Sequence, residues 1–228
     1  MMLQLIDKRK IYLYVVILFF LLSIHNINTS NFLNEYFKVK KIIINTSIEE
    51  KTNKEISNSL SQFYNFNIFS INKNEIINIL ENFEIISEYK IEKQYPSIIK
   101  VEIKQTKILA YYFNNNQKIL IGENGKKIRN EIFFKENLPL IVGKVKIKNF
   151  LKLKDELITN GFVLSDFTKF YSFKSNRWDL LYQNKFIVKL PIENVEESIK
   201  IFRNLINNSN VKKLRIIDLR IKNKIILS

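Results

Sequence analysis

The chain has 228 residues, of which 46% are apolar and 26% charged, and its formal net charge is +15. That length and apolar content suffice for a hydrophobic core, in one large or two small domains. Cysteine is absent and His25 is the one histidine, which excludes Cys/His metal sites, disulfides and Ser-His or Cys-His nucleophiles. The four glycines form no phosphate-binding loop. We therefore expect no catalytic residue, metal, cofactor or small-molecule substrate.

The positive charge has two interpretations. A basic surface is typical of proteins that bind nucleic acid or anionic lipid. Here, however, lysines are scattered singly along the chain, and Lys, Asn, Ile and Phe are abundant throughout. We attribute most of the charge to this general bias of composition and expect no nucleic-acid partner.

The N-terminal region contains a candidate membrane segment. Residues 11–24 (IYLYVVILFFLLSI) carry no charge, and extension to Ile27 gives a helix of about 25 Å, the short end of a bilayer span. The preceding Lys-Arg-Lys favours a cytoplasmic N-terminus. We predict a cytoplasmic tail over 1–10, a transmembrane signal-anchor over 11–27 and export of the remainder. A cleavable signal peptide and a buried core helix are the alternatives.

Residues 37–106 predict the order strand, helix, helix, strand, strand. A β-branched run over 39–44 ends in an Asn-Thr-Ser turn. Thr52 and Asn72 each precede a glutamate by three residues, the capping-box pattern, and apolar residues follow both at helical spacing. Alternating apolar and polar residues on either side of Pro96 predict a hairpin. This order is that of a two-layer α+β module.

Residues 107–228 predict a β-rich domain of antiparallel strands with two helices. One helix covers about 150–158 and ends at Asn160-Gly161, and another begins at Asn194. The turn residues favour a meander of short strands. The strand candidates are 108–113, 118–121, 170–173, 178–182, 186–190, 214–221 and 224–227. The last of them is expected to form an exposed edge.

Several motifs, in order along the chain, resemble those of the FtsQ/DivIB family of bacterial cell-division proteins. The first module resembles that family's POTRA domain. The matching stretches are 37–42 (FKVKKI), 67–71 (NIFSI), 95–103 (YPSIIKVEI), 138–143 (LPLIVG), 177–180 (RWDL), 188–191 (VKLP) and 217–220 (IDLR). Two stretches depart from the family pattern: 105–110 (QTKILA) keeps only the alanine of its usual motif, and 183–185 (QNK) lacks the common glycine.

The resemblance implies a non-enzymatic scaffold of the divisome, the assembly that directs septal wall synthesis. Such proteins lie in the inner membrane with most of the chain in the periplasm. Their POTRA domain is associated with localisation and with the DNA translocase. Their C-terminal edge binds the small FtsB and FtsL proteins, and other divisome components, including the septal wall synthases, are further partners.

The expected partner-binding residues lie at the C-terminal edge. An edge strand presents unpaired N–H and C=O groups to which a partner strand can add, and nearby cations attract an acidic partner segment. The edge is expected over residues 221–228, and Arg177 lies on the neighbouring strand that carries Trp178. The candidate residues are Arg177, Arg220, Ile221, Lys222, Asn223, Lys224, Ile225 and Ile226.

Each candidate also has a purely structural interpretation. Arg220 can simply pair with Asp218. Lys222 and Lys224 can protect the edge against aggregation. Trp178 is expected in the core, because a single Trp on an alternating strand usually faces inward.

Two other classes of function stay open from sequence. POTRA modules also occur in secretion and outer-membrane assembly proteins, although this chain has one such module and no series of barrel strands. A membrane-anchored wall hydrolase would use paired carboxylates. Neighbouring acids such as Glu196-Glu197 instead fit a solvated helix start.

Overall fold

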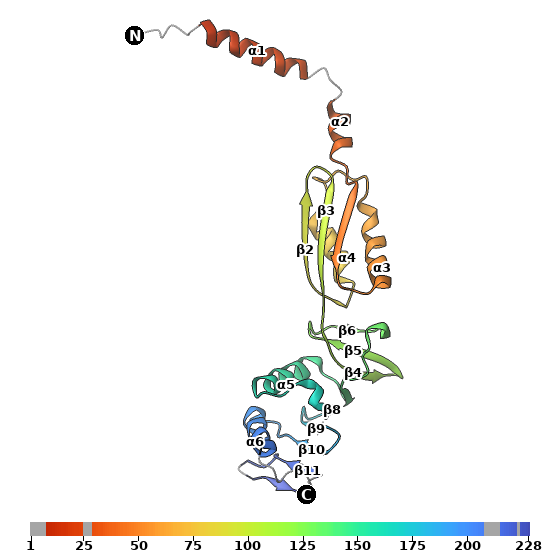
Figure 1. The fold of residues 1–228 in the computed structure, drawn as a ribbon, viewed down its shortest axis with the longest axis vertical. Helices are drawn as coiled ribbons and strands as arrows, with labels where there is room; N and C mark the ends of the chain where they lie inside the picture. The colour runs from red at the N-terminus through yellow and green to blue at the C-terminus, as the bar shows by residue number, and fades with distance from the viewer. Residues whose placement is uncertain (1–7, 25–28, 208–214, 223) are drawn as a thin grey trace, which may run out of the picture. The chain divides into compact units, whose positions relative to one another are not determined.

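The computed structural model describes residues 8–24, 29–207, 215–222 and 224–228 (Figure 1). The chain divides into two compact units, Met1–Asn82 with Tyr89–Lys104, and Phe83–Glu88 with Gln105–Ser228.

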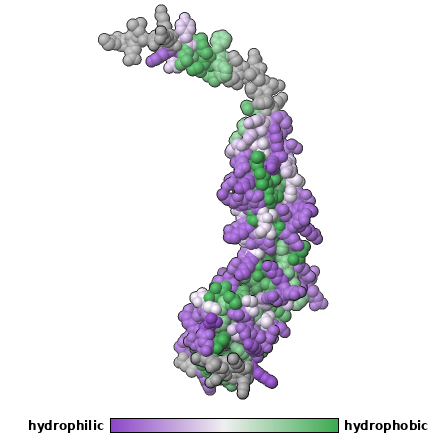
Figure 2. Space-filling model, in the orientation of Figure 1, coloured by the Kyte–Doolittle hydropathy of each residue, from purple (hydrophilic) through white to green (hydrophobic). Residues whose placement is uncertain are grey.

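Two helices open the described chain, α1 (Lys8–Ile24) and α2 (Thr29–Tyr36). Apolar side chains of α1 from Ile11 to Leu22 are exposed, and Figure 2 shows them as a hydrophobic surface. None of the helices in the described ranges is both long and apolar enough to cross a membrane. Helix α1 covers residues 11–24 of the segment predicted over 11–27, and residues 25–27 lie outside the described residues. The membrane-spanning role of this segment stays a prediction.

The first unit contains a three-stranded sheet with two helices. Its elements are β1 (Lys41–Thr46), α3 (Glu50–Leu60), the 3-10 turn η1 (Ser61–Phe63), α4 (Lys73–Glu81), β2 (Ile86–Gln94) and β3 (Ile98–Gln105). The strand order is β1-β3-β2, with β1 parallel to β3 from Lys41↔Ile98 to Thr46↔Ile103. The apolar residues Ile56, Leu60 and Val101 are buried. The predicted order of elements is confirmed.

The start of α3 differs from the prediction. The helix begins at Glu50, so Thr52 lies inside its first turn and does not cap it. Thr52 is buried, and its hydroxyl oxygen has no hydrogen-bond partner. By contrast, the Asn72 side chain caps α4 by accepting from the Asn74 N–H. The cap predicted at Asn72 is therefore confirmed, and the cap predicted at Thr52 is wrong, because Thr52 is buried on the inner face of α3.

The second unit is built on a nine-stranded sheet of order β12-β11-β10-β9-β8-β7-β4-β5-β6. Its strands are β4 (Ile108–Asn114), β5 (Gln117–Gly122), β6 (Lys127–Ile128), β7 (Leu140–Gly143), β8 (Phe167–Ser172), β9 (Trp178–Tyr182), β10 (Phe186–Lys189), β11 (Ile216–Asp218) and β12 (Ile226–Leu227). Between them lie α5 (Ile147–Thr159), α6 (Val195–Asn207) and the 3-10 turns η2 (Glu131–Phe133) and η3 (Leu164–Asp166).

The prediction of a purely antiparallel domain is wrong. The β4–β7, β7–β8 and β10–β11 pairs are parallel, and the other pairs are antiparallel. Helix α5 follows β7 and precedes β8, and α6 follows β10 and precedes β11, so each helix serves as a crossover between parallel neighbours. Local turn signals could not reveal these pairings, because the parallel partners are joined through a whole helix or, for β4 and β7, through two other strands.

An aromatic core fills the second unit. Phe150 of α5, Phe202 of α6 and Phe170 of β8 are fully buried, and Phe162 stacks on Phe202 with centroids 5.1 Å apart. Trp178 is also buried, as predicted. Gly161 has φ +80° directly after the Asn160 cap of α5, the left-handed position expected for a helix-ending glycine.

The last strands are shorter than the sequence pattern indicated. The candidate over 214–221 is reduced to β11, and the candidate over 224–227 is reduced to β12. Ile221, Lys222, Lys224 and Ile225 therefore lie in the connection rather than on an edge strand. The reason is Asp218, whose side chain accepts the Arg220 N–H at 3.1 Å and so turns the chain just after β11.

Candidate functional site

The candidate site lies where parallel strands β10 and β11 both end. The loop over residues 191–194 lies between β10 and α6, and residues 219–222 follow β11. Because the strands are parallel, with Lys189 opposite Asp218, these two segments emerge at the same edge of the sheet. In open sheets with crossover helices, this edge is where binding crevices form.

A groove of about 720 Å³ occupies this place. It is lined by Arg177, Pro191, Ile192, Glu193, Asn194, Glu197, Ser198, Ile201, Leu219, Arg220, Ile221, Lys222, Lys224 and Ile225. The exposed side chains of Ile192, Ile221 and Ile225 give it apolar surface. Four cationic and two acidic residues line it. Arg177 and Arg220 have aspartate partners, so Lys222 and Lys224 are the lining cations for which the described residues supply no ion pair.

A row of side chains crosses the sheet next to the groove. Asp179 of β9 is opposite Lys189 of β10, which is opposite Asp218 of β11, which is opposite Ile226 of β12. Residues in register on neighbouring strands lie on the same face, so acid, base and acid alternate across three strands. The positive charge of Lys189 favours the charged form of both aspartates, and the row leads to the outermost strand of the sheet.

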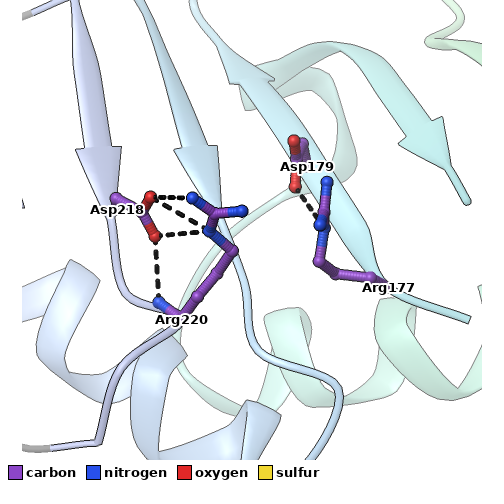
Figure 3. Close-up of polar contacts among 4 residues, drawn as sticks. All are labelled: Arg177, Asp179, Asp218 and Arg220. Atoms are coloured by element: carbon purple, nitrogen blue, oxygen red, sulfur yellow. Dashed lines mark hydrogen bonds and ion pairs between the residues drawn. The ribbon is translucent and has the colours of Figure 1, made fainter. Parts of the chain in front are cut away.

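Arg220 forms a bidentate ion pair with Asp218 (Figure 3). Its Nη2 donates to Oδ2 at 2.6 Å and its Nε donates to Oδ1 at 2.9 Å. The side chain of Asp218 is only 10% exposed, whereas that of Arg220 is 42% exposed. These hydrogen bonds hold the pKa of Asp218 below its ordinary value, although partial burial opposes the shift.

Arg177 and Asp179 form a second, less complete pair (Figure 3). Arg177 Nε lies 3.3 Å from Asp179 Oδ1, but the two buried atoms are not aligned as a hydrogen bond. The Arg177 guanidinium also lies over the Phe173 ring, 4.1 Å from its centroid. Burial raises the pKa of Asp179 above its ordinary value despite the attraction of Arg177, so this carboxylate is poorly compensated.

Strand β12 is the outermost strand of the described sheet. Ile216 and Ser228 exchange both backbone hydrogen bonds, at 2.9 and 3.2 Å, which makes them a hydrogen-bonded antiparallel pair. By alternation, the next pair, Ile217 and Leu227, points its backbone groups away from each other. The N–H and C=O of Leu227 therefore face outward, where no described strand pairs with them. Ile226 and Leu227 are exposed.

The structure brings together most of the predicted site residues. Arg177, Arg220, Ile221, Lys222, Lys224 and Ile225 line the groove, and Ile226 lies beside it on β12. Asn223 lies outside the described residues.

The opposite wall of the groove was not found from the sequence. It consists of the loop over residues 191–194 and the first turns of α6, including Glu197, Ser198 and Ile201. The signal available was Pro191 after an apolar strand and before a helix start. Without knowledge that β10 and β11 are parallel, that signal could not be assigned to the same edge.

Within the described residues, no group of His, Cys, Asp and Glu side chains is placed to hold a metal ion.

Comparison with known proteins gives two matches that together cover most of the chain. Residues 37–105 match the family described as POTRA domain, FtsQ-type, and residues 110–220 match Cell division protein FtsQ/DivIB, C-terminal. The fold and these matches define an α+β protein with a POTRA domain and a β-rich C-terminal domain.

Two curated proteins with similar sequences support the same family assignment. The chain is 30% identical over 195 residues to Cell division protein FtsQ of Rickettsia bellii, covering 82% of this chain and 71% of that protein. It is 30% identical over 162 residues to Cell division protein FtsQ of Rickettsia prowazekii, covering 69% of this chain and 60% of that protein. The chain belongs to the FtsQ/DivIB family of bacterial cell-division proteins.

A solved structure is also similar, the major extracytoplasmic domain of the cell-division protein DivIB of Geobacillus stearothermophilus. The match has 12% identity and a TM-score of 0.34, and it covers 46% of this chain and 95% of that domain.

Proposed function

We propose that this cell-division protein is a non-enzymatic scaffold that recruits and links early and late division proteins at the septum. In this proposal α1 is the membrane anchor and the two units lie in the periplasm. The uncharged run over residues 11–24 and the Lys-Arg-Lys before it support this orientation. The anchor would keep both units close to the inner membrane, where the septal machinery works.

The observation that carries the proposal is the outward-facing backbone of Leu227 beside a cation-lined groove. An extended partner segment can pair with β12 by strand addition. The same partner can place apolar side chains against Ile192 and Ile225. Because Lys222 and Lys224 are exposed at the rim, an acidic segment such as that of an FtsB-type protein, bound together with FtsL, would be favoured.

The first unit supplies the other contacts in this proposal. As an FtsQ-type POTRA domain it would contribute to localisation and to contact with the DNA translocase. Its exposed residues, rather than the groove of the second unit, would carry these contacts. The septal wall synthases would be further partners of the protein.

A binding titration tests the proposed edge. Lys222→Glu with Lys224→Glu reverses two exposed charges without touching the Arg220–Asp218 pair, which a change at Arg220 would break. The purified chain should bind an FtsB-type partner roughly tenfold more weakly, as expected for loss of charge attraction at a rim. Lys135→Glu with Lys174→Glu, both exposed in the same unit, is the matched control and should bind normally. Equal affinity of both double variants contradicts the proposed edge.

Cells provide the test of the scaffold role. Depletion of the protein should block septation and give undivided cells by microscopy. Supply of the Lys222/Lys224 double variant should restore division poorly, while the control double variant should restore it fully. Normal septation after depletion would overturn the scaffold proposal.

A further inference from the structure

A cluster of aromatic rings lies at one end of the first unit, outside the site described above. Tyr36, Phe37, Phe69 and Tyr95 form a continuous chain of contacts. Phe37 packs edge-on against Tyr36 and Phe69, and Phe69 stacks on Tyr95 with centroids 4.8 Å apart. Phe69 and Tyr95 are nevertheless 58% and 57% exposed, respectively, so the rings face solvent rather than a core.

The backbone fixes this aromatic cluster at the end of the sheet where β1 and β3 begin. Phe37 accepts the Ile68 N–H at 2.9 Å, and Phe69 is held by the Asn67 side chain, which accepts its N–H at 3.0 Å. Tyr95 lies in the turn that precedes β3. The cluster is therefore a built surface and not a set of unrelated exposed rings.

Lysines border the aromatic cluster. Lys40 and Lys41 donate their backbone N–H groups to the Ser97 carbonyl, at 2.9 and 3.3 Å, next to the turn that carries Tyr95. Both lysines are exposed. The nearby acid Glu35 is paired with Lys38, so it does not cancel the charge of the other two. The surface thus combines Tyr and Phe rings with cations.

This chemistry fits the surface of an anionic bilayer. Tyr and Phe rings partition to the boundary between headgroups and acyl chains, and lysines are attracted to anionic headgroups. The length of chain between α1 and the aromatic cluster also supports a membrane surface as the binding partner. Helix α2 rises about 12 Å, and the remaining links between Ile24 and Phe37 add at most about 22 Å, so the cluster lies within about 35 Å of the end of α1.

We propose that the aromatic cluster docks the first unit on the surface of the anionic membrane in which α1 is anchored. The inference rests on the anchoring part of the proposed function and adds a second membrane contact, made by a folded domain. Docking would limit the rotation of the POTRA domain and present one fixed face to its partners.

Fluorescent labels on the full chain test the docking. The chain has no cysteine, so each introduced cysteine carries the only thiol-reactive label. Ser70→Cys places a label beside Phe69 and keeps all four rings. Ser47→Cys is the matched control: it is also an exposed serine of this unit, but it follows the far end of β1, about 20 Å away. Leu18→Cys reports on insertion of α1. The protein is reconstituted into vesicles of phosphatidylcholine with or without phosphatidylglycerol, and quenching by lipid-borne nitroxides is measured.

We expect quenching at position 18 in both lipids, quenching at 70 only with phosphatidylglycerol, and none at 47. Lys40→Glu with Lys41→Glu should abolish quenching at 70 without changing it at 18. Quenching at 18 with equal, low quenching at 70 and 47 overturns the docking and leaves the anchor intact, which would assign the cluster to a protein partner. Absence of quenching at 18 overturns the anchor and the docking together. Equal quenching at 70 in both lipids contradicts the role of the lysines.

Discussion

Arg220 donates two hydrogen bonds to Asp218, from Nη2 to Oδ2 at 2.6 Å and from Nε to Oδ1 at 2.9 Å, although the residues are only two positions apart. The pair stabilises the turn that follows β11, and this turn places Ile221 and Lys222 at the groove. Arg220 therefore acts first as a structural residue of the groove wall. Its 42% exposure leaves one side of the guanidinium available to a partner carboxylate.

The Arg220–Asp218 pair should give a recognisable pH dependence. Because the pKa of Asp218 is lowered in the folded protein, the pair stabilises above the unfolded-state pKa of about 3.9, and this stability is lost as pH falls through the folded-state pKa. Asp218→Asn should lower the free energy of unfolding by roughly 1 kcal/mol at pH 7, since part of the pair is exposed to solvent. Urea unfolding of both proteins between pH 2.5 and about 7 measures this difference. A difference that does not shrink toward low pH contradicts the assignment.

Asp179 should behave in the opposite sense. Burial raises its pKa in the folded protein, so its contribution to stability is greatest below the unfolded-state pKa and is lost as pH rises through the folded-state pKa. Asp179→Asn should therefore gain stability relative to the natural chain as pH rises from about 4 to 7. The same urea titrations provide the measurement. If the natural chain instead gains on the variant with rising pH, the Arg177 ion pair outweighs the cost of burial.

Proline substitutions can separate strand addition from folding. Leu227→Pro removes an N–H that faces outward, so it should change the free energy of unfolding by less than about 0.5 kcal/mol and yet block pairing with a partner strand. Ile226→Pro removes an N–H that faces β11 and should destabilise by about 1 kcal/mol.

Partner titration and thermal unfolding of the two proline variants provide the comparison. Full binding by Leu227→Pro would exclude strand addition at β12. Loss of stability by Leu227→Pro equal to that of Ile226→Pro would show that the assigned register is wrong.

Gly143 is expected to be intolerant of any side chain. It has φ +103°, and a Cβ at this position would lie 2.2 Å from the Ser172 carbonyl oxygen on the paired strand β8. Gly143→Ala should therefore lower the free energy of unfolding by about 2–4 kcal/mol. Gly125→Ala is the matched control, because it also has a positive φ but would contact only Leu151 at 3.5 Å, and it should cost about 1 kcal/mol. Equal thermal midpoints for the two variants would contradict this reading of the β7–β8 contact.

The sequence by itself determined the local elements and the family. Apolar periodicity located α4 and α5, the Asn72 cap marked a helix start, and the Asn160-Gly161 pair marked a helix end. Trp178 was correctly assigned to the core. The motifs identified the FtsQ/DivIB resemblance, and they contain both Arg177 and Arg220. These features depend on neighbours within a few residues, which is the range over which capping and periodicity act.

Only the tertiary structure decided how the strands pair and what the groove contains. The parallel pairing of β10 with β11 brings the loop over residues 191–194 to the segment after Asp218, although about 25 residues separate them. The packing also decides that Asp179 is buried with an incomplete partner, which raises its pKa, whereas the hydrogen bonds from Arg220 lower the pKa of Asp218. The positive charge that first suggested a basic surface is spread over many exposed lysines, of which Lys222 and Lys224 line the groove. The physical reason is that burial and strand register are properties of long-range packing, which no local pattern encodes.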